Sequence, residues 1–192
     1  MEIEIKKLTP ELVEDYLHFF DVTPHDDYLE EHKCYCVYWA SDDCEGKDFS
    51  TAEKRRALAY EYVKSGHIQG YLAYHEGKVV GWCNANNLAK CVKCRGFQID
   101  LGHVPLDDKK VKAVFCFTVA PEMKRKGIAT ALLERVCEDA KLDGYDVVEA
   151  YPFNEDGNHT CDFGGYINMY RKCGFELYLD TFKGKIMRKY LK

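Results

Sequence analysis

The sequence predicts an α/β domain built on a mixed sheet, and two stretches carry that prediction. In the first, the strand-like run "VKAVFCFTVA" is followed by a loop, the apolar-periodic helix "IATALLERVCEDAKL" and a second strand-like run, "YDVVEAYPF". A right-handed crossover of this kind pairs its two strands in parallel. In the second, "YLAYHEGKVVGWCNA" places a turn between two strand-like runs, which indicates an antiparallel hairpin. Together they favour a mixed sheet flanked by helices.

Composition and charge fit a soluble protein with one folding unit spanning residues 1–192. Of the 192 residues 46% are hydrophobic, and no repeat or Gly/Ser linker divides the chain. The N-terminus "MEIEIKKLTPELVED" is charged from its second residue, and no apolar run is long enough to span a membrane, so we expect a cytoplasmic protein with no membrane partner. A net charge of -5 argues against a nucleic-acid partner. We expect a monomer or a homodimer.

The remaining elements follow from local patterns. Residues 1–8 alternate like a strand, and a helix follows with Thr9 as N-cap and Pro10 in its first position. A second helix spans 50–66, with Ser50 and Glu53 as a capping box. We expect segment 87–110 to be irregular, and segment 34–40, "CYCVYWA", is left open between a strand and a buried apolar stretch. The end of the chain predicts a long loop, a short helix and two strands, at 154–165, 166–173, 175–181 and 185–191.

The cysteines have two interpretations. Cys34 with Cys36 and Cys91 with Cys94 could supply four thiolates to zinc. However, the two pairs lie far apart in the sequence and no histidine has the spacing of a zinc finger, and a reduced buried cysteine behaves as a small hydrophobic residue. We therefore expect no metal.

The loop before the long helix is the strongest candidate for a binding site. It places Lys124, Arg125 and Lys126 directly before Gly127. The first N–H groups of a helix have no intrahelical partner and lie at the positive end of its dipole, which stabilises an anion there. A run of cations is also a common feature of solvated turns. The buried strand in front of the loop favours the anion site.

Two motifs resemble signatures of the GNAT acetyltransferases. "FTVAPEMKRKGIATALLERV" is similar to the family's acetyl-CoA signature, with Lys124 at a position usually held by Arg or Gln, followed by Gly127 and Ala129. "MYRKCGFEL" resembles the second signature. The resemblance covers residues 68–190 and implies the GNAT acyl-CoA N-acyltransferase fold: a mixed, mostly antiparallel sheet, splayed at its central parallel strands. It also implies acetyl-CoA as co-substrate and an amine as acceptor.

The same resemblance implies residues that hold acetyl-CoA. The strand at Phe117, Thr118 and Val119 would bond the pantetheine arm through its backbone, and the Val119 N–H would stabilise the oxyanion. The pyrophosphate would lie on the backbone from Arg125 to Thr130, with the neighbouring cations around it. The predicted loop contacts are Lys124, Arg125, Lys126, Gly127, Ile128, Ala129 and Thr130.

The predicted catalytic residues are Tyr170 and Glu149. Tyr170 matches the family tyrosine that protonates the departing thiolate, and a phenol with a pKa of about 10 keeps its proton near neutrality. It could also simply pack a helix against the sheet. Glu149, or His159 in the following loop, would accept a proton from the acceptor ammonium, although each could be an ordinary solvated residue.

The predicted function is acetyl transfer from acetyl-CoA to a primary amine of a small molecule or a protein. The alternative is a non-catalytic acyl-CoA-binding or thiol/zinc-sensing module. The loop 154–165, the segment 34–40 and Trp82 are the candidates for the acceptor pocket. The sequence does not name the acceptor.

Overall fold

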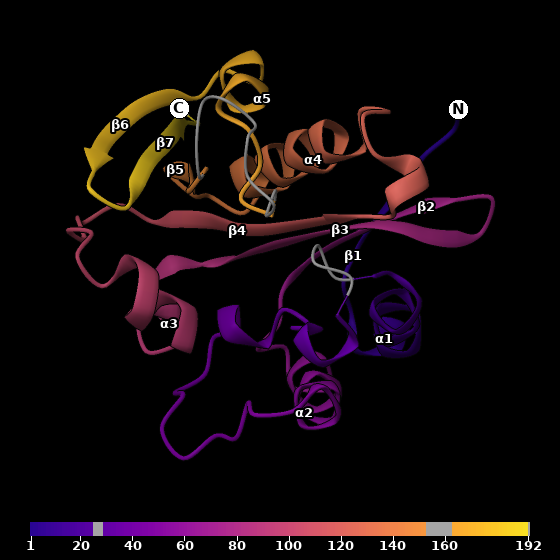
Figure 1. Cartoon of the computed structure of the whole chain (residues 1–192). Helices are drawn as coiled ribbons and strands as arrows, with labels where there is room; N and C mark the ends of the chain where they lie inside the picture. The colour runs from indigo at the N-terminus through magenta and orange to yellow at the C-terminus, as the bar shows by residue number, and fades with distance from the viewer. Residues whose placement is uncertain (25–28, 153–162, 192) are drawn as a thin grey trace.

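The computed structural model describes residues 1–24, 29–152 and 163–191, and its centre is a twisted sheet between two layers of helices (Figure 1). The sheet has seven strands in the order β1-β2-β3-β4-β5-β7-β6. The strands are β1 (Glu4–Lys7), β2 (Gly70–His75), β3 (Lys78–Asn87), β4 (Val111–Val119), β5 (Val147–Ala150), β6 (Glu176–Thr181) and β7 (Gly184–Tyr190).

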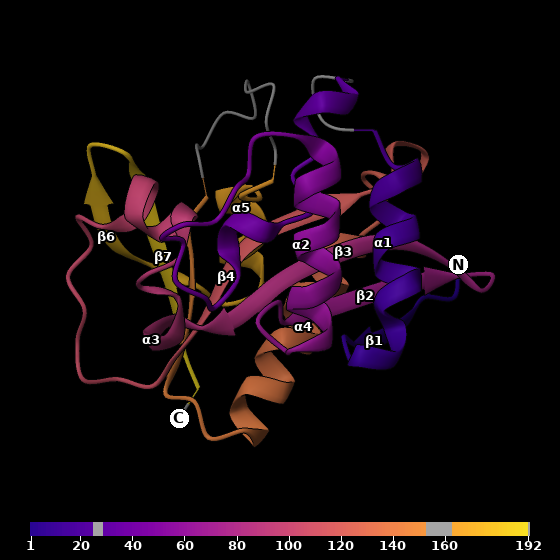
Figure 2. The same ribbon diagram turned by 90° about the horizontal axis from the view of Figure 1, so that it is seen from below.

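Helices cover both faces of the sheet. In Figure 1, α1, α2 and α3 lie on one face and α4 and α5 on the other, and Figure 2 shows α1 and α2 side by side across the strands. The helices are α1 (Val13–Val22), α2 (Ala52–Lys64), α3 (Leu88–Cys91), α4 (Ile128–Leu142) and α5 (Ile167–Lys172). Single helical turns add η1 (Pro10–Leu12), η2 (Glu30–His32), η3 (Val37–Trp39), η4 (Phe97–Leu101) and η5 (Pro121–Met123).

The sheet opens at its only parallel pair among the described strands. β4 pairs with β5 from Val111 opposite Val147 to Val114 opposite Ala150, and all other neighbouring strands are antiparallel. Beyond Val114, β4 continues to Val119 with no partner on β5. The expected mixed sheet, splayed between these two strands, is confirmed.

A bulge at Phe115 lies where β4 and β5 part. Asn84 on β3 is opposite Cys116 and Ala85 is opposite Val114, so Phe115 is an extra residue on β4. A bulge bends its strand and redirects the side chains around it. Phe115 is therefore turned towards the face of the sheet that carries Trp39.

The core on the α1 face is aromatic. Trp82 of β3 is fully buried and meets Tyr16 of α1 edge to face at 4.9 Å. Tyr16 is fully buried as well, and its hydroxyl donates to the Tyr35 carbonyl at 2.7 Å, which satisfies its polar end. These contacts hold the segment 34–40 against the sheet.

Local predictions differ from the structure in a few places. The α2 N-cap is Thr51, whose Oγ1 accepts from the Lys54 N–H at 3.3 Å, so the predicted capping box at Ser50 is wrong by one residue. The open segment 34–40 contains the turn η3, and segment 87–110, expected to be irregular, contains α3 and η4. Among the described residues, no helix is both long and apolar enough to cross a membrane.

Candidate active site

The basic loop folds into a helix N-terminus with unpaired backbone donors. Arg125 and Gly127 both adopt left-handed conformations, with φ of 61° and 83°, and α4 begins at Ile128. The first backbone bond of α4 is from the Ala131 N–H to the Gly127 carbonyl, at 2.9 Å. The N–H groups of residues 128–130 therefore have no intrahelical acceptor and point out of the helix end.

Glycine at 127 suits the left-handed backbone conformation there. A Cβ placed there would meet no described atom within 4 Å, so space around it is open, but its φ of 83° is one that other residues rarely adopt. The next residue, Ile128, is buried against Gly81 of β3, where an added Cβ would come within 2.8 Å of the isoleucine methyl. This contact fixes the helix end on the sheet while Lys124, Arg125 and Lys126 stay exposed around it.

The free edge of β4 presents two residues to the gap. The Ala120 N–H donates to the Val80 carbonyl at 3.0 Å, so by strand alternation Thr118 also directs its backbone towards β3. Phe117 and Val119 direct theirs to the opposite side. There the Phe117 N–H donates to the Phe163 carbonyl at 2.7 Å. Val119, predicted as the oxyanion donor, therefore faces the gap through its backbone, whereas Thr118 does not.

Tyr170 lies on the α5 side of the gap. It is fully buried, and its hydroxyl donates to the Gly164 carbonyl at 2.8 Å. Its ring lies 6.5 Å from that of Phe117 and 5.3 Å from that of Phe175. Burial raises the pKa of Tyr170 well above its ordinary value, so the phenol keeps its proton. The structure thus brings Tyr170 to the predicted strand.

Glu149 belongs to a buried network of charges. One carboxylate oxygen accepts from Arg188 Nε at 2.5 Å and the other from the Tyr151 hydroxyl at 2.5 Å. Arg188 Nη1 also pairs with Asp107 at 2.5 Å, and its guanidinium lies 3.6 Å from the ring of Tyr178. Both oxygens of Glu149 are therefore engaged, and Tyr151 is its link to the cavity described below. His159 lies outside the described residues, as does most of the loop 154–165.

The cysteines of the described segments pack as buried or half-buried thiols. Cys36 accepts from Asn84 Nδ2 at 3.3 Å, and Cys94 accepts from the Phe97 N–H at 3.4 Å. Burial disfavours the Cys36 thiolate, yet hydrogen bonds from Cys116 and Asn84 lower the pKa of this thiol below its ordinary value. Within the described part of the chain, no three His, Cys, Asp or Glu side chains are grouped as metal ligands.

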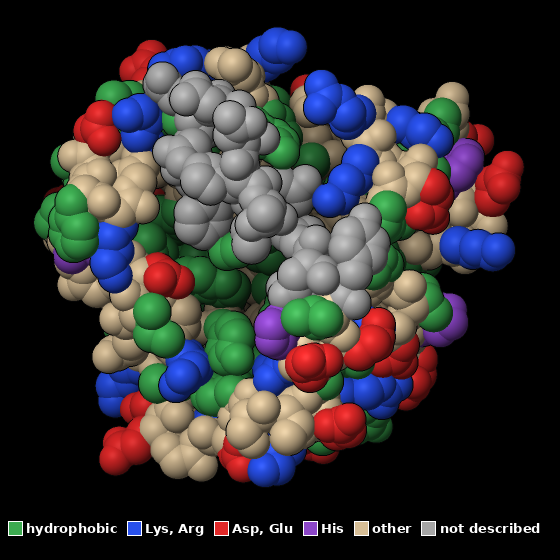
Figure 3. Space-filling model, viewed as in Figure 1, with side chains coloured by type: hydrophobic (Ala, Val, Ile, Leu, Met, Phe, Trp, Pro, Cys, Tyr) green, Lys and Arg blue, Asp and Glu red, His purple; other side chains and the backbone are tan. Residues whose placement is uncertain are grey.

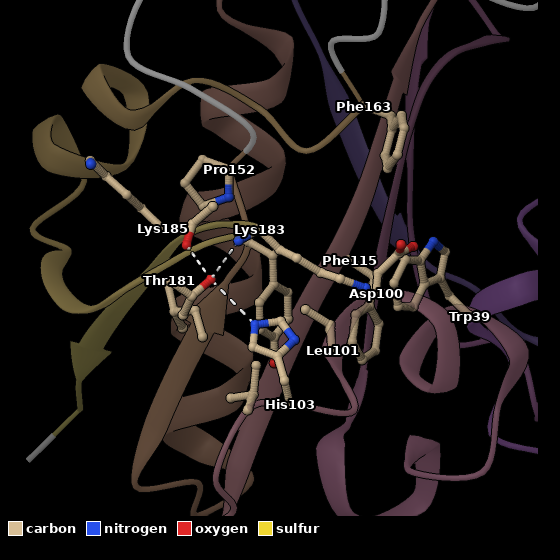
Figure 4. A pocket seen from close by; sticks show the side chains of 14 residues that line it. Trp39, Asp100, Leu101, His103, Phe115, Pro152, Phe163, Thr181, Lys183 and Lys185 are labelled. Atoms are coloured by element: carbon tan, nitrogen blue, oxygen red, sulfur yellow. Dashed lines mark hydrogen bonds between the residues drawn. The ribbon is translucent and has the colours of Figure 1, made fainter.

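A cavity of about 250 Å³ opens beside the gap (Figure 4). It lies between the β6–β7 hairpin and the segment 97–104, where the face seen in Figure 3 is hollowed and lined by apolar side chains. Phe115 and Phe163 line it, so it reaches the part of β4 that carries Phe117. Polar side chains line the remainder: Asp100, His103, Thr181, Lys183 and Lys185.

Three parallel aromatic rings form one wall of this cavity. The rings of Trp39 and Phe115 stack at 4.8 Å and those of Phe115 and Tyr151 at 5.6 Å, each pair within 8° of parallel. Gly96 makes room for Trp39, because a Cβ there would come within 2.6 Å of the indole. Trp82, a candidate for the acceptor pocket, is instead buried against Tyr16.

The comparison with known proteins follows this geometry. The sequence model of the Acetyltransferase (GNAT) family matches residues 34–175, which include β4, the basic loop, α4 and Tyr170. The chain belongs to the GNAT acetyltransferase family. It is therefore an N-acyltransferase of a family that uses acetyl-CoA. No curated protein sequence gave a match.

Solved GNAT structures share the fold of this acetyltransferase over its whole length. A putative GNAT acetyltransferase from Desulfovibrio desulfuricans is 12% identical, with 100% of both chains covered and a TM-score of 0.56. The PaiA N-acetyltransferase from Thermoplasma acidophilum, in complex with coenzyme A, is 18% identical over 99% of both chains, with a TM-score of 0.56. A ribosomal-protein-alanine N-acetyltransferase from Brucella melitensis is 20% identical over 98% of this chain and 99% of that one, with a TM-score of 0.53.

Sequence reasoning missed most of the residues that line this cavity. Trp39 fell within a segment named as a pocket candidate, but nothing local linked it to Phe115 or Tyr151. Asp100 lies in the stretch expected to be irregular and matches no motif. Only the folded chain brings these residues, from four separate segments, around one cavity.

Proposed function

We propose that this GNAT enzyme transfers an acetyl group from acetyl-CoA to a primary amine of a small molecule or a protein. The observation that carries the proposal is the meeting of three features at one opening of the sheet: the free edge of β4, the α4 N-terminus and the aromatic cavity. Acetyl-CoA supplies the activated thioester, and the chain supplies binding, orientation and a proton.

The α4 N-terminus fits a pyrophosphate. The N–H groups of residues 128–130 and the left-handed Gly127 form an exposed anion site, and Lys124, Arg125 and Lys126 add positive charge near it. The backbone N–H groups bind directionally, whereas the long cationic side chains attract from solvent. We therefore propose that the backbone N–H groups of this loop contribute most of the binding free energy for the pyrophosphate.

The edge of β4 would hold the arm that carries the thioester. Val119 directs its backbone N–H into the gap, where it can stabilise the negative charge that develops on the acetyl oxygen during transfer. The Phe117 N–H already bonds to Phe163, so an arm paired there would exchange with that carbonyl. Thr118 can contribute only through its side chain, since its backbone is directed towards β3.

Tyr170 is proposed as the general acid. Its buried phenol stays protonated through the neutral range, and its ring faces Phe117, the strand residue next to the proposed thioester position. Delivering its proton to the departing thiolate requires the hydroxyl to rotate away from the Gly164 carbonyl. A short rotation of one side-chain hydroxyl suffices for this step.

Glu149 remains a prediction as the base. Its carboxylate reaches the cavity only through the Tyr151 hydroxyl, so the acceptor proton would travel by way of Tyr151 or a water molecule. Glu149 also forms an ion pair with Arg188 across the sheet, which gives it a structural role. A cytoplasmic location and a single domain over residues 1–192 are likewise predictions of the sequence.

Release of coenzyme A tests the proposal. The full chain is incubated with acetyl-CoA and a panel of primary amines, and free thiol and acetylated product are both measured. Product that forms with an amine, in amounts equal to the thiol released, supports N-acetylation. Tight binding of acetyl-CoA in a thermal-shift assay, with no product from any small or peptide amine, would instead support the non-catalytic alternative.

A further inference from the structure

We propose that Asp100 binds the ammonium group of the acceptor, and that the acceptor is a small primary amine with a flat apolar body. This inference rests on the proposed acetyl transfer and names the class of acceptor. Three observations carry it: an unpaired carboxylate, a wall of parallel rings, and the commitment of the other charged groups to contacts within the protein.

Among the described residues that line the cavity, Asp100 is the charged one with no described partner. It is exposed at the end of η4, and it makes no hydrogen bond or ion pair with any residue that the structure describes. In Figure 4 it lies on the side of the cavity that also holds Trp39 and Phe115. An ammonium bound there would gain a charge-assisted hydrogen bond.

The cationic groups around the cavity are already engaged. Lys185 pairs with Asp180 at 2.9 Å and extends away from the cavity in Figure 4. Lys183 Nζ donates to the Ile99 carbonyl at 2.5 Å, which links the β6–β7 hairpin to η4. His103 Nε2 lies 3.3 Å from Thr181 Oγ1, and its ring packs on Phe182. Lys183 keeps its positive charge at the neutral Ile99 carbonyl, and Asp100 is the one carboxylate among the described residues that line the cavity, so Asp100 is the group there that can bind an ammonium.

The ring wall selects the body of the ligand. Phe115 stacks on both Trp39 and Tyr151, so the three rings present their edges to the cavity, and a flat apolar group can pack against them edge to face; Trp39 is only half-buried. The cavity volume of about 250 Å³ is near the lower limit for small-molecule pockets, which is about 300 Å³. A compact arylalkylamine fits this combination of a small volume, aromatic rings and a carboxylate. The carboxylate of a free amino acid would instead lie close to the Asp100 carboxylate and be repelled by it.

Calorimetric titration tests binding without relying on turnover. The probes are 2-phenylethylamine, n-butylamine and phenylalanine, each titrated into the full chain with coenzyme A present. We expect 2-phenylethylamine to bind at least about 10-fold more tightly than the other two. Asp100→Asn should weaken that binding about 10-fold to 100-fold and raise KM for the amine, while KM for acetyl-CoA stays the same.

Two variants act as controls. Asp108→Asn removes an exposed carboxylate from the same stretch that does not line the cavity, and binding should be unchanged. Asp100→Glu keeps the charge and should recover part of the affinity. Equal binding to Asp100→Asn and the wild type, or binding of phenylalanine as tight as that of 2-phenylethylamine, would overturn the inference.

The remaining outcomes separate this inference from the proposed function. Binding of 2-phenylethylamine that depends on Asp100, with no acetylated product from any amine, supports the ammonium site and refutes the enzyme proposal. Acetylation of peptide amines without measurable binding of 2-phenylethylamine supports the enzyme proposal and overturns the acceptor class proposed for Asp100.

Discussion

Arg188 on β7 and Glu149 on β5 form a buried ion pair across the sheet, with Nε 2.5 Å from Oε2. The two residues are direct partners in the antiparallel register, so the backbone of the sheet sets their separation. Tyr151 donates to the same carboxylate, and its ring stacks on Phe115. The ion pair thereby positions one wall of the cavity that is proposed to bind the acceptor.

Removal of Arg188 should destabilise the fold strongly. Arg188→Met leaves Glu149 buried without its cation, and the loss of one partner of a buried pair costs about 3–5 kcal/mol in the free energy of unfolding. Urea denaturation measures this change. Lys185→Met, on the same strand as Arg188, breaks the partly exposed pair with Asp180 of β6 and should change stability by no more than about 1 kcal/mol. Equal effects of the two variants would contradict a structural role for the buried network.

Two substitutions of Gly127 should show whether side-chain charge or backbone conformation has the larger effect on acetyl-CoA affinity at the proposed pyrophosphate site. Gly127→Glu introduces a carboxylate at an anion site, so we expect at least a 10-fold loss, as an order of magnitude, in acetyl-CoA affinity by calorimetry. Gly127→Asn tolerates the left-handed conformation and carries no charge, so it should retain most of the affinity. Lys126→Ala should weaken binding less than Gly127→Glu. Full affinity in Gly127→Glu would exclude the site.

Loss of the Tyr170 hydroxyl should slow the reaction and leave acetyl-CoA binding intact. Tyr170→Phe keeps the ring that packs on Phe175 but removes the proposed proton donor, for which we expect a fall in kcat of about 10²-fold or more. Tyr166→Phe, at a partly exposed neighbouring position, should retain the wild-type rate. If Tyr170→Phe keeps the wild-type kcat at every pH tested, Tyr170 is not the acid.

Enlargement of Gly96 should disturb the acceptor side alone. The Cβ in Gly96→Ala would meet the Trp39 indole at 2.6 Å and push it from its stack on Phe115. KM for the amine should therefore rise while acetyl-CoA affinity stays constant. In a Trp39→Ala background the same change has no ring to displace and should have little further effect, so a double-mutant cycle measures the coupling. Additive effects would show that Trp39 does not transmit the change.

Lys112 should make stability rise with pH in the alkaline range. Burial first, and Lys7 second, lower the pKa of this β4 lysine to about 8 from its ordinary 10.5. Between these values the unfolded chain holds a proton that the folded chain has lost, so the free energy of unfolding increases with pH, by up to about 3 kcal/mol. Lys112→Met should remove this rise and be more stable than the wild type at pH 7. Parallel pH profiles for the two proteins would refute the shift.

The sequence by itself determined the order of the elements and the helix N-terminus that is proposed to hold the cofactor. The parallel β4–β5 pair, the hairpin β2–β3, the start of α4 and the closing strands all depend on patterns within a few residues, such as alternation, a left-handed glycine or a crossover helix. The position of the loop from Lys124 to Thr130 before α4 was predictable for the same reason, and anion binding there stays a proposal that rests on the backbone of a helix N-terminus.

Only the tertiary structure decided the cavity proposed for the acceptor and the environment of Glu149. Trp39, Asp100 and Phe115 meet through the bulge on β4 and the packing of η3 and η4, and no local pattern encodes such contacts. Glu149 looked available as a base because its partner Arg188 lies 39 residues further along the chain. The physical reason is the same in both cases: side-chain contacts across the sheet depend on register, and register is set by the fold as a whole.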